Sequence, residues 1–169
     1  MQTFLPLATT DFGEIAKTLD NKRLHKQALE GWQILMVLLS LDPEGNHREP
    51  KGWVNHPAVK MWRGHESALL TYINSMVMEW EMRGFKSTIM DKAIATHSRA
   101  VELGRVGPYT FPAWMNNQEL YEQIAITHRQ ALLVKDYEWY SQFSWDEDPG
   151  HNPGTYEYLW PTEKETVNG

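Results

Sequence analysis

Residues 19–35 read LDNKRLHKQALEGWQIL, and this stretch decides the fold of the chain. From residue 24 onwards its apolar side chains recur every three or four positions, as they do on one face of a helix. These positions are Leu24, Ala28, Trp32, Leu35 and Leu39. Upstream, Asp11 can cap a helix and Glu14 follows three residues later, as in a capping box. The pattern predicts one or two helices over residues 12–39.

Helical spacing recurs in three further segments, which are residues 57–83, 86–101 and 117–135. Gly84 is a suitable C-cap for the first of these helices. The segments 42–52 and 104–112 are rich in Pro and Gly and predict loops. No useful stretch alternates apolar and polar residues as a half-buried strand does. We therefore predict an all-α, compact, single-domain helical fold with an irregular, aromatic-rich C-terminal tail.

Length and composition exclude several classes of protein. The chain has 169 residues, of which 41% are hydrophobic, so we expect one domain with a real core rather than disorder. It contains no cysteine, which excludes disulfides, thiolate catalysis and cysteine-ligated metal sites. The best apolar run, residues 34–39, is far shorter than the roughly 18 residues that cross a bilayer. Because the first residues also lack an export signal, we expect a cytoplasmic protein without membrane spans.

Charge is distributed unevenly along the chain. The formal net charge is −6, yet residues 1–135 contain 15 basic and 14 acidic side chains, whereas residues 136–169 contain one and eight. We expect a helical domain over residues 1–145 and an acidic C-terminal tail over residues 146–169. The densest basic segment is residues 17–26, with four Lys or Arg against one Asp. A surface that binds phosphate starts there, and the alternative is a solvated helix face.

A polar stripe lies on the predicted helix of residues 12–39. Arg23, Gln27 and Glu30 are spaced i, i+4 and i+7, and Lys26 is an i, i+4 partner of Glu30. A carboxylate among cations at the edge of an apolar face is suited to general acid–base catalysis or to stabilising a developing cation. The alternative is an ordinary surface ion pair that contributes about 0.3–0.5 kcal/mol.

The turn before Pro57 holds a second group of candidates. Asn55 and His56 stand at the expected start of a helix, where free N–H groups attract anions and these side chains can bind a phosphate or a base edge. His56 can also transfer protons. The alternative is that Asn55 is an N-cap and His56 a structural histidine. His65 and Glu66 lack a second ligand at helical spacing, so we expect no metal site.

The third group lies near the end of the last helix. His128, Arg129 and Lys135 are followed by the aromatic residues of the segment 137–145. Cations interleaved with rings suit a partly opened nucleic acid, because rings stack on bases and cations hold phosphates. The alternative is a terminal apolar segment that wraps the core.

Four stretches of the chain together resemble the pyrimidine dimer DNA glycosylase (endonuclease V-like) family. They read LDNKRLHKQALEGWQIL, NHPAVKMWRGHE, EWEMRGF and HRQALLVKDYEWYSQFSW, and they cover most of residues 1–145. The opening MQTFLP is typical of a bacterial and phage branch. The resemblance implies an all-α enzyme of a bacterial or phage-infected cell that binds duplex DNA containing a damaged or modified pyrimidine. It further implies base flipping, cleavage of the N-glycosidic bond and strand breakage by β-elimination, without metal or other cofactor.

This chemistry needs an amine that forms a Schiff base at the sugar C1′ and a carboxylate that stabilises the cationic sugar and moves protons. The family pattern uses the N-terminal amine. Gln2 is bulky and disfavours removal of the initiator methionine, so the resemblance assigns the amine to Met1. The family's carboxylate aligns with Arg23, which leaves Glu30 as the best acidic side chain.

We therefore expect one site on the first helical region. The predicted catalytic residues are Glu30, Met1 and Arg23. The predicted DNA-binding residues are Lys22, Lys26, Gln27, Asn55, His56, Trp62, Arg63, His128, Arg129 and Lys135. Three alternatives remain open: a monofunctional glycosylase in which Glu30 activates water, an enzyme that acts on a modified pyrimidine base in phage DNA, and a non-catalytic nucleotide- or partner-binding protein on the same scaffold.

Overall fold

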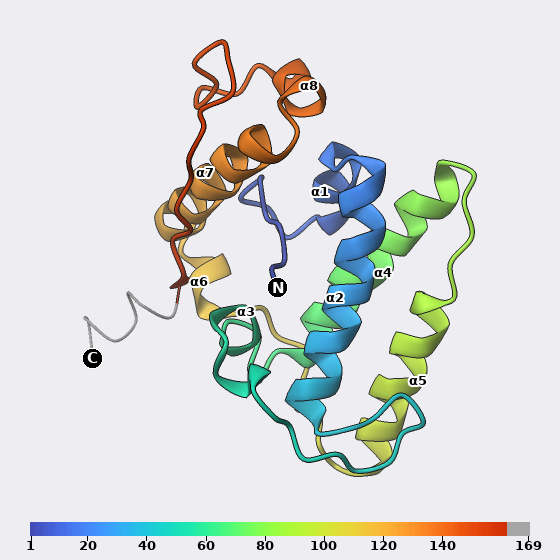
Figure 1. The fold of residues 1–169 in the computed structure, drawn as a ribbon. Coiled ribbons are helices and arrows are strands. Elements are labelled where there is room, and N and C mark those ends of the chain that lie inside the picture. Colours follow the sequence, from blue (N-terminus) through green and yellow to red (C-terminus); the bar gives the residue numbers. More distant parts are fainter. Residues whose placement is uncertain (162–169) are drawn as a thin grey trace.

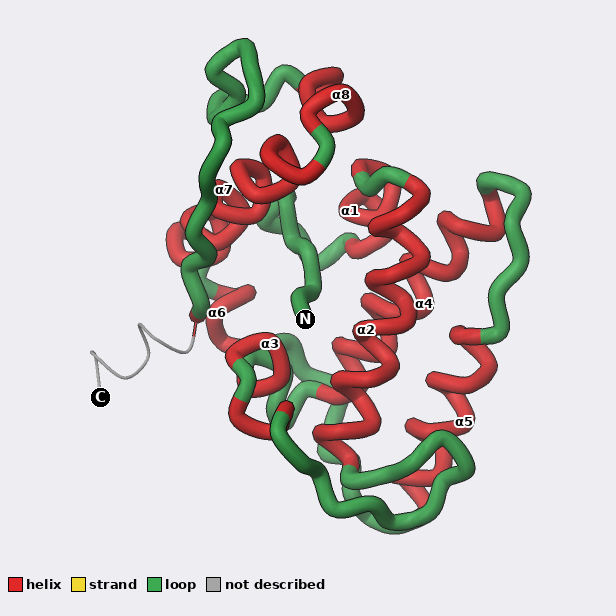
Figure 2. The backbone as a smooth tube through the Cα atoms, in the orientation of Figure 1, coloured by secondary structure: helices red, strands yellow, loops and turns green. Residues whose placement is uncertain are grey.

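The computed structural model describes residues 1–161, and within that part it contains eight α-helices and two short 3-10 helices (Figure 1). The α-helices are α1 (Phe12–Thr18), α2 (Asn21–Leu39), α3 (Pro57–Lys60), α4 (Glu66–Met82), α5 (Ile89–Glu102), α6 (Ala113–Asn116), α7 (Gln118–Lys135) and α8 (Tyr137–Tyr140). The 3-10 helices are η1 (Trp53–Asn55) and η2 (Ser141–Phe143). These described residues form no strand (Figure 2), only an isolated bridge between Leu41 and His47. The predicted all-α class is confirmed.

The helices form two groups with the N-terminal segment between them. Helices α2, α4 and α5 pack against one another, and α1 packs on α4. Helices α6, α7 and α8 follow one another in the second group. Residues 1–6 run between α2 and α7, so the first residue lies near the middle of the molecule (Figure 1). This arrangement positions the candidate site.

Helix ends follow the caps that the sequence indicates. The Asp11 side chain accepts hydrogen bonds from the N–H groups of Gly13 and Glu14, which confirms the predicted start of α1. Asn117 accepts from the Leu120 N–H at the start of α7. Each cap satisfies N–H groups that lack a partner within the helix.

The prediction of one helix over residues 57–83 is wrong, because the chain forms α3 and then, after a break, α4. At the break Gly64 has a φ of +82°, which is the left-handed conformation that ends helices. Its N–H donates to Glu66 Oε1 at 3.0 Å. Apolar residues on both sides of the break face the same core, and for that reason their spacing suggests one helix. Gly84, at a φ of +94°, follows the end of α4 as predicted.

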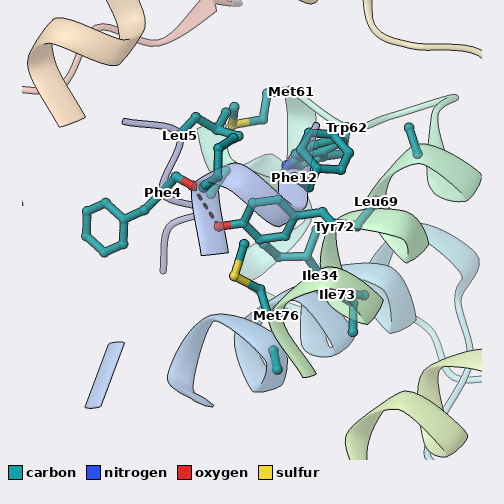
Figure 3. Packing of buried hydrophobic residues seen from close by; sticks show 14 of the residues in the cluster. Phe4, Leu5, Phe12, Ile34, Met61, Trp62, Leu69, Tyr72, Ile73 and Met76 are labelled. Carbon is teal, nitrogen blue, oxygen red and sulfur yellow. Dashed lines mark hydrogen bonds between the residues drawn. The ribbon is translucent and has the colours of Figure 1, made fainter. Parts of the chain in front are cut away.

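Aromatic rings fill the core between α1, α3 and α4 (Figure 3). The Tyr72 ring meets Phe12 and Trp62 at centroid distances of 5.5 and 5.9 Å. Where α2 crosses α4, a Cβ atom at Gly31 would lie 2.6 Å from Ile73 Cγ1. A glycine within a helix costs roughly 0.5–1 kcal/mol relative to alanine, and here it permits the close approach of α4.

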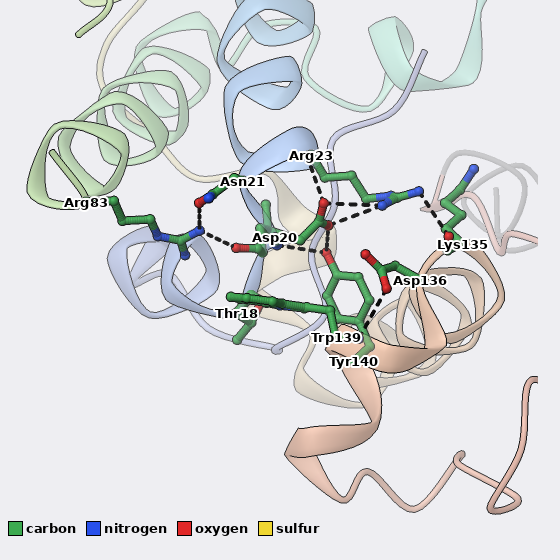
Figure 4. Close-up of polar contacts among 10 residues, drawn as sticks. Thr18, Asp20, Asn21, Arg23, Arg83, Lys135, Asp136, Trp139 and Tyr140 are labelled. Carbon is green, nitrogen blue, oxygen red and sulfur yellow. Dashed lines mark hydrogen bonds and ion pairs between the residues drawn. The ribbon is translucent and has the colours of Figure 1, made fainter. Parts of the chain in front are cut away.

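The aromatic residues after α7 fix the second group of helices to the first (Figure 4). Trp139 Nε1 donates to the Thr18 carbonyl at 2.8 Å, and the Tyr140 hydroxyl donates to Asp20 Oδ1 at 2.5 Å. Tyr140 is fully buried. The alternative reading, in which these rings wrap the core, therefore describes Tyr140 and Trp139.

Residues 146–161 return along α7 (Figure 1). Asn152 Nδ2 donates to the Val134 carbonyl at 3.0 Å, and the Leu159 N–H donates to Thr127 Oγ1 at 3.3 Å. The division into residues 1–145 and an acidic tail stays a prediction, and its residues 162–169 lie outside the described part. None of the helices within residues 1–161 combines the length and apolarity that a bilayer crossing requires.

Candidate active site

The N-terminal segment is held by side chains from distant helices. Its backbone has no strand partner, so its N–H groups need other acceptors. The Phe4 N–H donates to Gln27 Oε1 at 2.7 Å, and the Leu5 N–H donates to His128 Nδ1 at 2.8 Å. The Tyr72 hydroxyl donates to the Phe4 carbonyl at 2.8 Å (Figure 3). Helices α2, α4 and α7 thus fix the path of this segment.

Two more of the predicted DNA-binding residues also hold this segment. Trp62 Nε1 donates to Thr3 Oγ1 at 3.0 Å, and Arg129 Nη1 donates to the Pro6 carbonyl at 2.9 Å. Arg129 is also paired with Glu147 at 2.7 Å. Trp62 and Arg129 are buried.

His128 is buried as well, and this burial lowers its pKa to about 3, so the imidazole is neutral. None of the three side chains, of Trp62, His128 and Arg129, lines the cavity described next.

The carboxylate of Glu30 lies beside the first peptide bond. The Gln2 N–H donates to Glu30 Oε2 at 3.2 Å, and Gln27 Nε2 donates to the same oxygen at 3.4 Å. Lys26 Nζ lies 3.7 Å from Glu30 Oε1, which confirms the expected i, i+4 pair. Only 14% of the Glu30 side chain is exposed. The carboxylate is therefore oriented by three groups and lies one residue from the α-amine of Met1.

A cavity of about 290 Å³, here called the polar pocket, opens in front of this carboxylate. It brings together seven of the residues that the sequence predicts: Met1, Lys22, Arg23, Lys26, Gln27, Glu30 and Lys135. Gln2, Phe4, Tyr156 and Tyr158 complete its lining. Helix α2 forms one wall, and the end of α7 with the returning C-terminal segment forms the opposite wall.

Arg23 bridges these two walls (Figure 4). Its Nη1 lies 3.2 Å from Asp20 Oδ1, and its Nη2 donates to the Lys135 carbonyl at 3.4 Å. Asp20 in turn accepts from Tyr140. The Arg23 side chain is 15% exposed, so it is an oriented cation, whereas Lys22 and Lys26 extend into solvent. The pocket thus carries one largely buried and several exposed positive charges.

His56 lies within electrostatic reach of the pocket. Burial lowers its pKa, the positive amine of Met1 lowers it further, and Glu30 opposes both effects. Its ring also lies 5.9 Å from that of Trp160. His56 Nδ1 accepts from the Ala58 N–H at 3.0 Å, so His56, and not Asn55 as the alternative reading held, caps α3.

Asn55 and Arg63 lie outside the lining of the polar pocket. Both are exposed, and Arg63 Nη2 donates to the Val54 carbonyl at 2.8 Å, which closes the turn before α3. Their predicted contact with DNA stays a prediction.

The sequence reading missed Tyr156 and Tyr158. Lys135, whose Nζ lies 5.1 Å from the Tyr156 ring centre, lowers the pKa of the Tyr156 hydroxyl. Burial raises the pKa of Tyr158. A signal was present, because Tyr156, Tyr158 and Trp160 alternate along residues 155–160, and side chains two apart in an extended segment share one face.

A second cavity, of about 560 Å³ and here called the apolar pocket, also touches Met1. Its lining is mainly apolar and includes Trp32, Met36, Val37, Leu41 and Trp53. Arg48 and Lys51 contribute two cations from the loop after α2. The two pockets therefore adjoin at the first residue. Within residues 1–161, no group of three His, Asp or Glu side chains is arranged to hold a metal ion.

Comparison with known proteins gives one match. A family model described as pyrimidine dimer DNA glycosylase matches residues 1–93, which is more than half of the chain. These residues include the N-terminal segment, helices α2 and α4, and the turn before α3. The searches of curated proteins and of solved structures yielded no match. The chain belongs to the pyrimidine dimer DNA glycosylase family.

Proposed function

We propose that this protein excises a damaged or modified pyrimidine from duplex DNA and then cleaves the strand, with the α-amine of Met1 as nucleophile and Glu30 as the proton-transfer group. The observation that carries the proposal is the 3.2 Å hydrogen bond from the Gln2 N–H to Glu30 Oε2, which holds a carboxylate at the peptide bond that follows Met1. An amine and a carboxylate are the two groups that this reaction needs.

The steps balance with these two groups and water. The ammonium of Met1 loses a proton to water, the neutral amine attacks C1′, and the C1′–N1 bond breaks with its electron pair leaving on the pyrimidine, which takes up a proton from water. Glu30 takes a proton from the attacking nitrogen and gives it to O4′ as the sugar ring opens, which leaves a C1′=N iminium. Glu30 then takes a proton from C2′, and the electron pair expels the 3′ phosphate as the C2′=C3′ bond forms.

The cations of the polar pocket account for DNA binding in this proposal. Lys22, Lys26 and Lys135 are exposed, so each can approach a phosphate, although Lys26 would then leave its 3.7 Å pair with Glu30. Arg23 is held by Asp20 and serves as an oriented phosphate contact. An extruded nucleotide brings C1′ to the amine, since neither group reaches C1′ within a stacked duplex.

The test is incubation of the protein with duplexes that contain a cyclobutane dimer, an abasic site or a hydroxymethylated pyrimidine, and with undamaged DNA. Strand breaks are scored with and without borohydride, and the trapped adduct is mapped by peptide mass. We expect a break and an adduct on residue 1. A protein extended by one glycine before Met1 is the control, because its amine is displaced and the adduct should be lost.

Other outcomes contradict the proposal in different ways. An adduct on Lys26 would show that this lysine, and not Met1, is the nucleophile, since its Nζ also lies close to Glu30. Base loss without an adduct would indicate a monofunctional enzyme in which Glu30 activates water. Binding of every duplex without cleavage would indicate a non-catalytic binding protein.

A further inference from the structure

Gln2 is buried in the wall of the polar pocket, with 5% of the residue exposed. Most of its polar groups are used. The backbone N–H donates to Glu30, and the side-chain Oε1 accepts from the Thr3 N–H at 2.8 Å. The remaining group, Nε2, has no hydrogen-bond partner among the described residues. A buried donor without a partner reduces the stability of the folded protein, so an acceptor from a bound ligand would be favourable here.

The orientation of the amide is fixed by its neighbours. If the amide were turned over, Nε2 would face the Thr3 N–H, which is also a donor. Tyr158 lies on the pocket side. Burial raises the pKa of its hydroxyl, and an interaction with the Gln2 side-chain amide opposes that effect, although the two groups do not meet in normal hydrogen-bond geometry. Nε2 carries two hydrogens, so this loose contact with Tyr158 leaves at least one of them for a ligand that enters the pocket.

The neighbours of Nε2 indicate which kind of acceptor atom it can bind. Phosphates are served by the cations Lys22, Lys26 and Lys135, so a neutral amide suits a neutral or weakly charged oxygen. Gln2 is adjacent to Met1, whose amine attacks C1′ in the proposed function. Only acceptors close to C1′ come within reach, and the pyrimidine O2 is one of them, because C2 is bonded to N1.

We propose that Gln2 Nε2 donates a hydrogen bond to O2 of the pyrimidine that leaves. This inference rests on the proposed function and adds to it a catalytic residue. When the C1′–N1 bond breaks, the electron pair on N1 delocalises onto O2. The hydrogen bond strengthens as this charge grows, so it stabilises the transition state more than the ground state.

The test compares base release with cleavage of DNA that has already lost its base. Gln2→Glu keeps an acceptor for the Thr3 N–H and removes the donor, whereas Gln2→Met removes both. Both side chains are bulky, so Met1 should be retained, and intact mass verifies this. Gln142→Met is the matched control for loss of a glutamine, because Gln142 is exposed and lies outside the polar pocket.

We expect both Gln2 variants to release the base about 10²-fold more slowly in single turnovers on a lesion duplex that the parent cleaves. Strand cleavage and borohydride trapping at a preformed abasic site should fall far less than base release does, because no base leaves there. Unchanged base release in the variants would overturn the inference. An equal loss on abasic DNA would also overturn it, since Gln2 would then act on the amine or the sugar.

Two results with the parent protein separate the inference from the proposed function. If the parent forms the adduct on abasic DNA but releases no base from any lesion duplex, Gln2 has no leaving base to stabilise. The inference then fails, while the amine and Glu30 keep their proposed roles. If the parent forms no adduct on abasic DNA, the proposed function fails first and the inference fails with it.

Discussion

The polar pocket and the apolar pocket share helix α2 and Met1 but differ in nearly every other respect. The helix contributes charged and amide side chains from residues 22–30 to the first and mainly apolar side chains from residues 32–37 to the second. Gly31, where a Cβ atom would meet Ile73 of α4, separates the two stretches. One helix can thus carry two tasks, because proton transfer needs charged groups, whereas holding a flat ring needs apolar area.

The largest effect is expected from a substitution in the polar pocket that leaves the apolar pocket unchanged. Glu30→Gln keeps the size of the side chain and removes its charge. We expect base excision and strand cleavage to fall by about 10²–10⁴-fold, the range for a general acid–base group, while binding of the lesion duplex persists. Glu14→Gln, an exposed carboxylate on α1, is the control. Full activity of Glu30→Gln on a substrate that the parent cleaves would remove Glu30 from the mechanism.

A smaller effect is expected in the apolar pocket. Trp53 is 47% exposed there, so its ring can stack on an extruded base. We expect Trp53→Ala to weaken binding of a lesion duplex by about 10-fold, since such stacking contributes roughly 1–3 kcal/mol per base. Binding of undamaged duplex should stay the same. Tyr109→Ala, with 53% exposure outside both pockets, is the control. Equal weakening on both duplexes would mean that Trp53 does not select the lesion.

The smallest expected effect concerns how strongly the charges of the polar pocket change the pKa of His56, which lies outside that pocket. The pKa of His56 is lowered from 6.5 by burial and by the Met1 amine, and Glu30 opposes this. NMR titration should give a midpoint below 6.5, and Glu30→Gln should lower it further. Because the folded state resists protonation, His56 should reduce stability as the pH falls below about 6.5. A midpoint that Glu30→Gln leaves in place would show that the two groups are not coupled.

Sequence patterns predicted the helices well, because periodicity and caps are local. The stripe of Arg23, Gln27 and Glu30 was also predictable, since helical geometry alone puts these residues on one side. The helix break at Gly64 was not predicted, because the apolar spacing continues across it. The sequence offered no way to find the role of His128, because its partner Leu5 is 123 residues away and nothing periodic links them.

The same limit applies to the tryptophans Trp62 and Trp53. A tryptophan that stacks on a base and a tryptophan that fills a core look identical in a sequence. Trp62, just after α3, is fully buried, whereas Trp53, in η1, is half-exposed, and this difference comes from tertiary packing. Tyr156 and Tyr158 reach the pocket because the chain turns back along α7, which is a tertiary event.

The anchoring of the N-terminal segment also has a consequence for biosynthesis. The ribosome makes Leu5 and Pro6 long before their partners on α7, His128 and Arg129, which emerge more than 120 residues later. Contacts between such distant residues form late, because the loop between them must close first. A nascent chain therefore cannot assemble the pocket around its first amine until α7 has left the ribosome. The segment that holds Met1, whose amine is the proposed nucleophile, is therefore positioned only after most of the described residues have been translated.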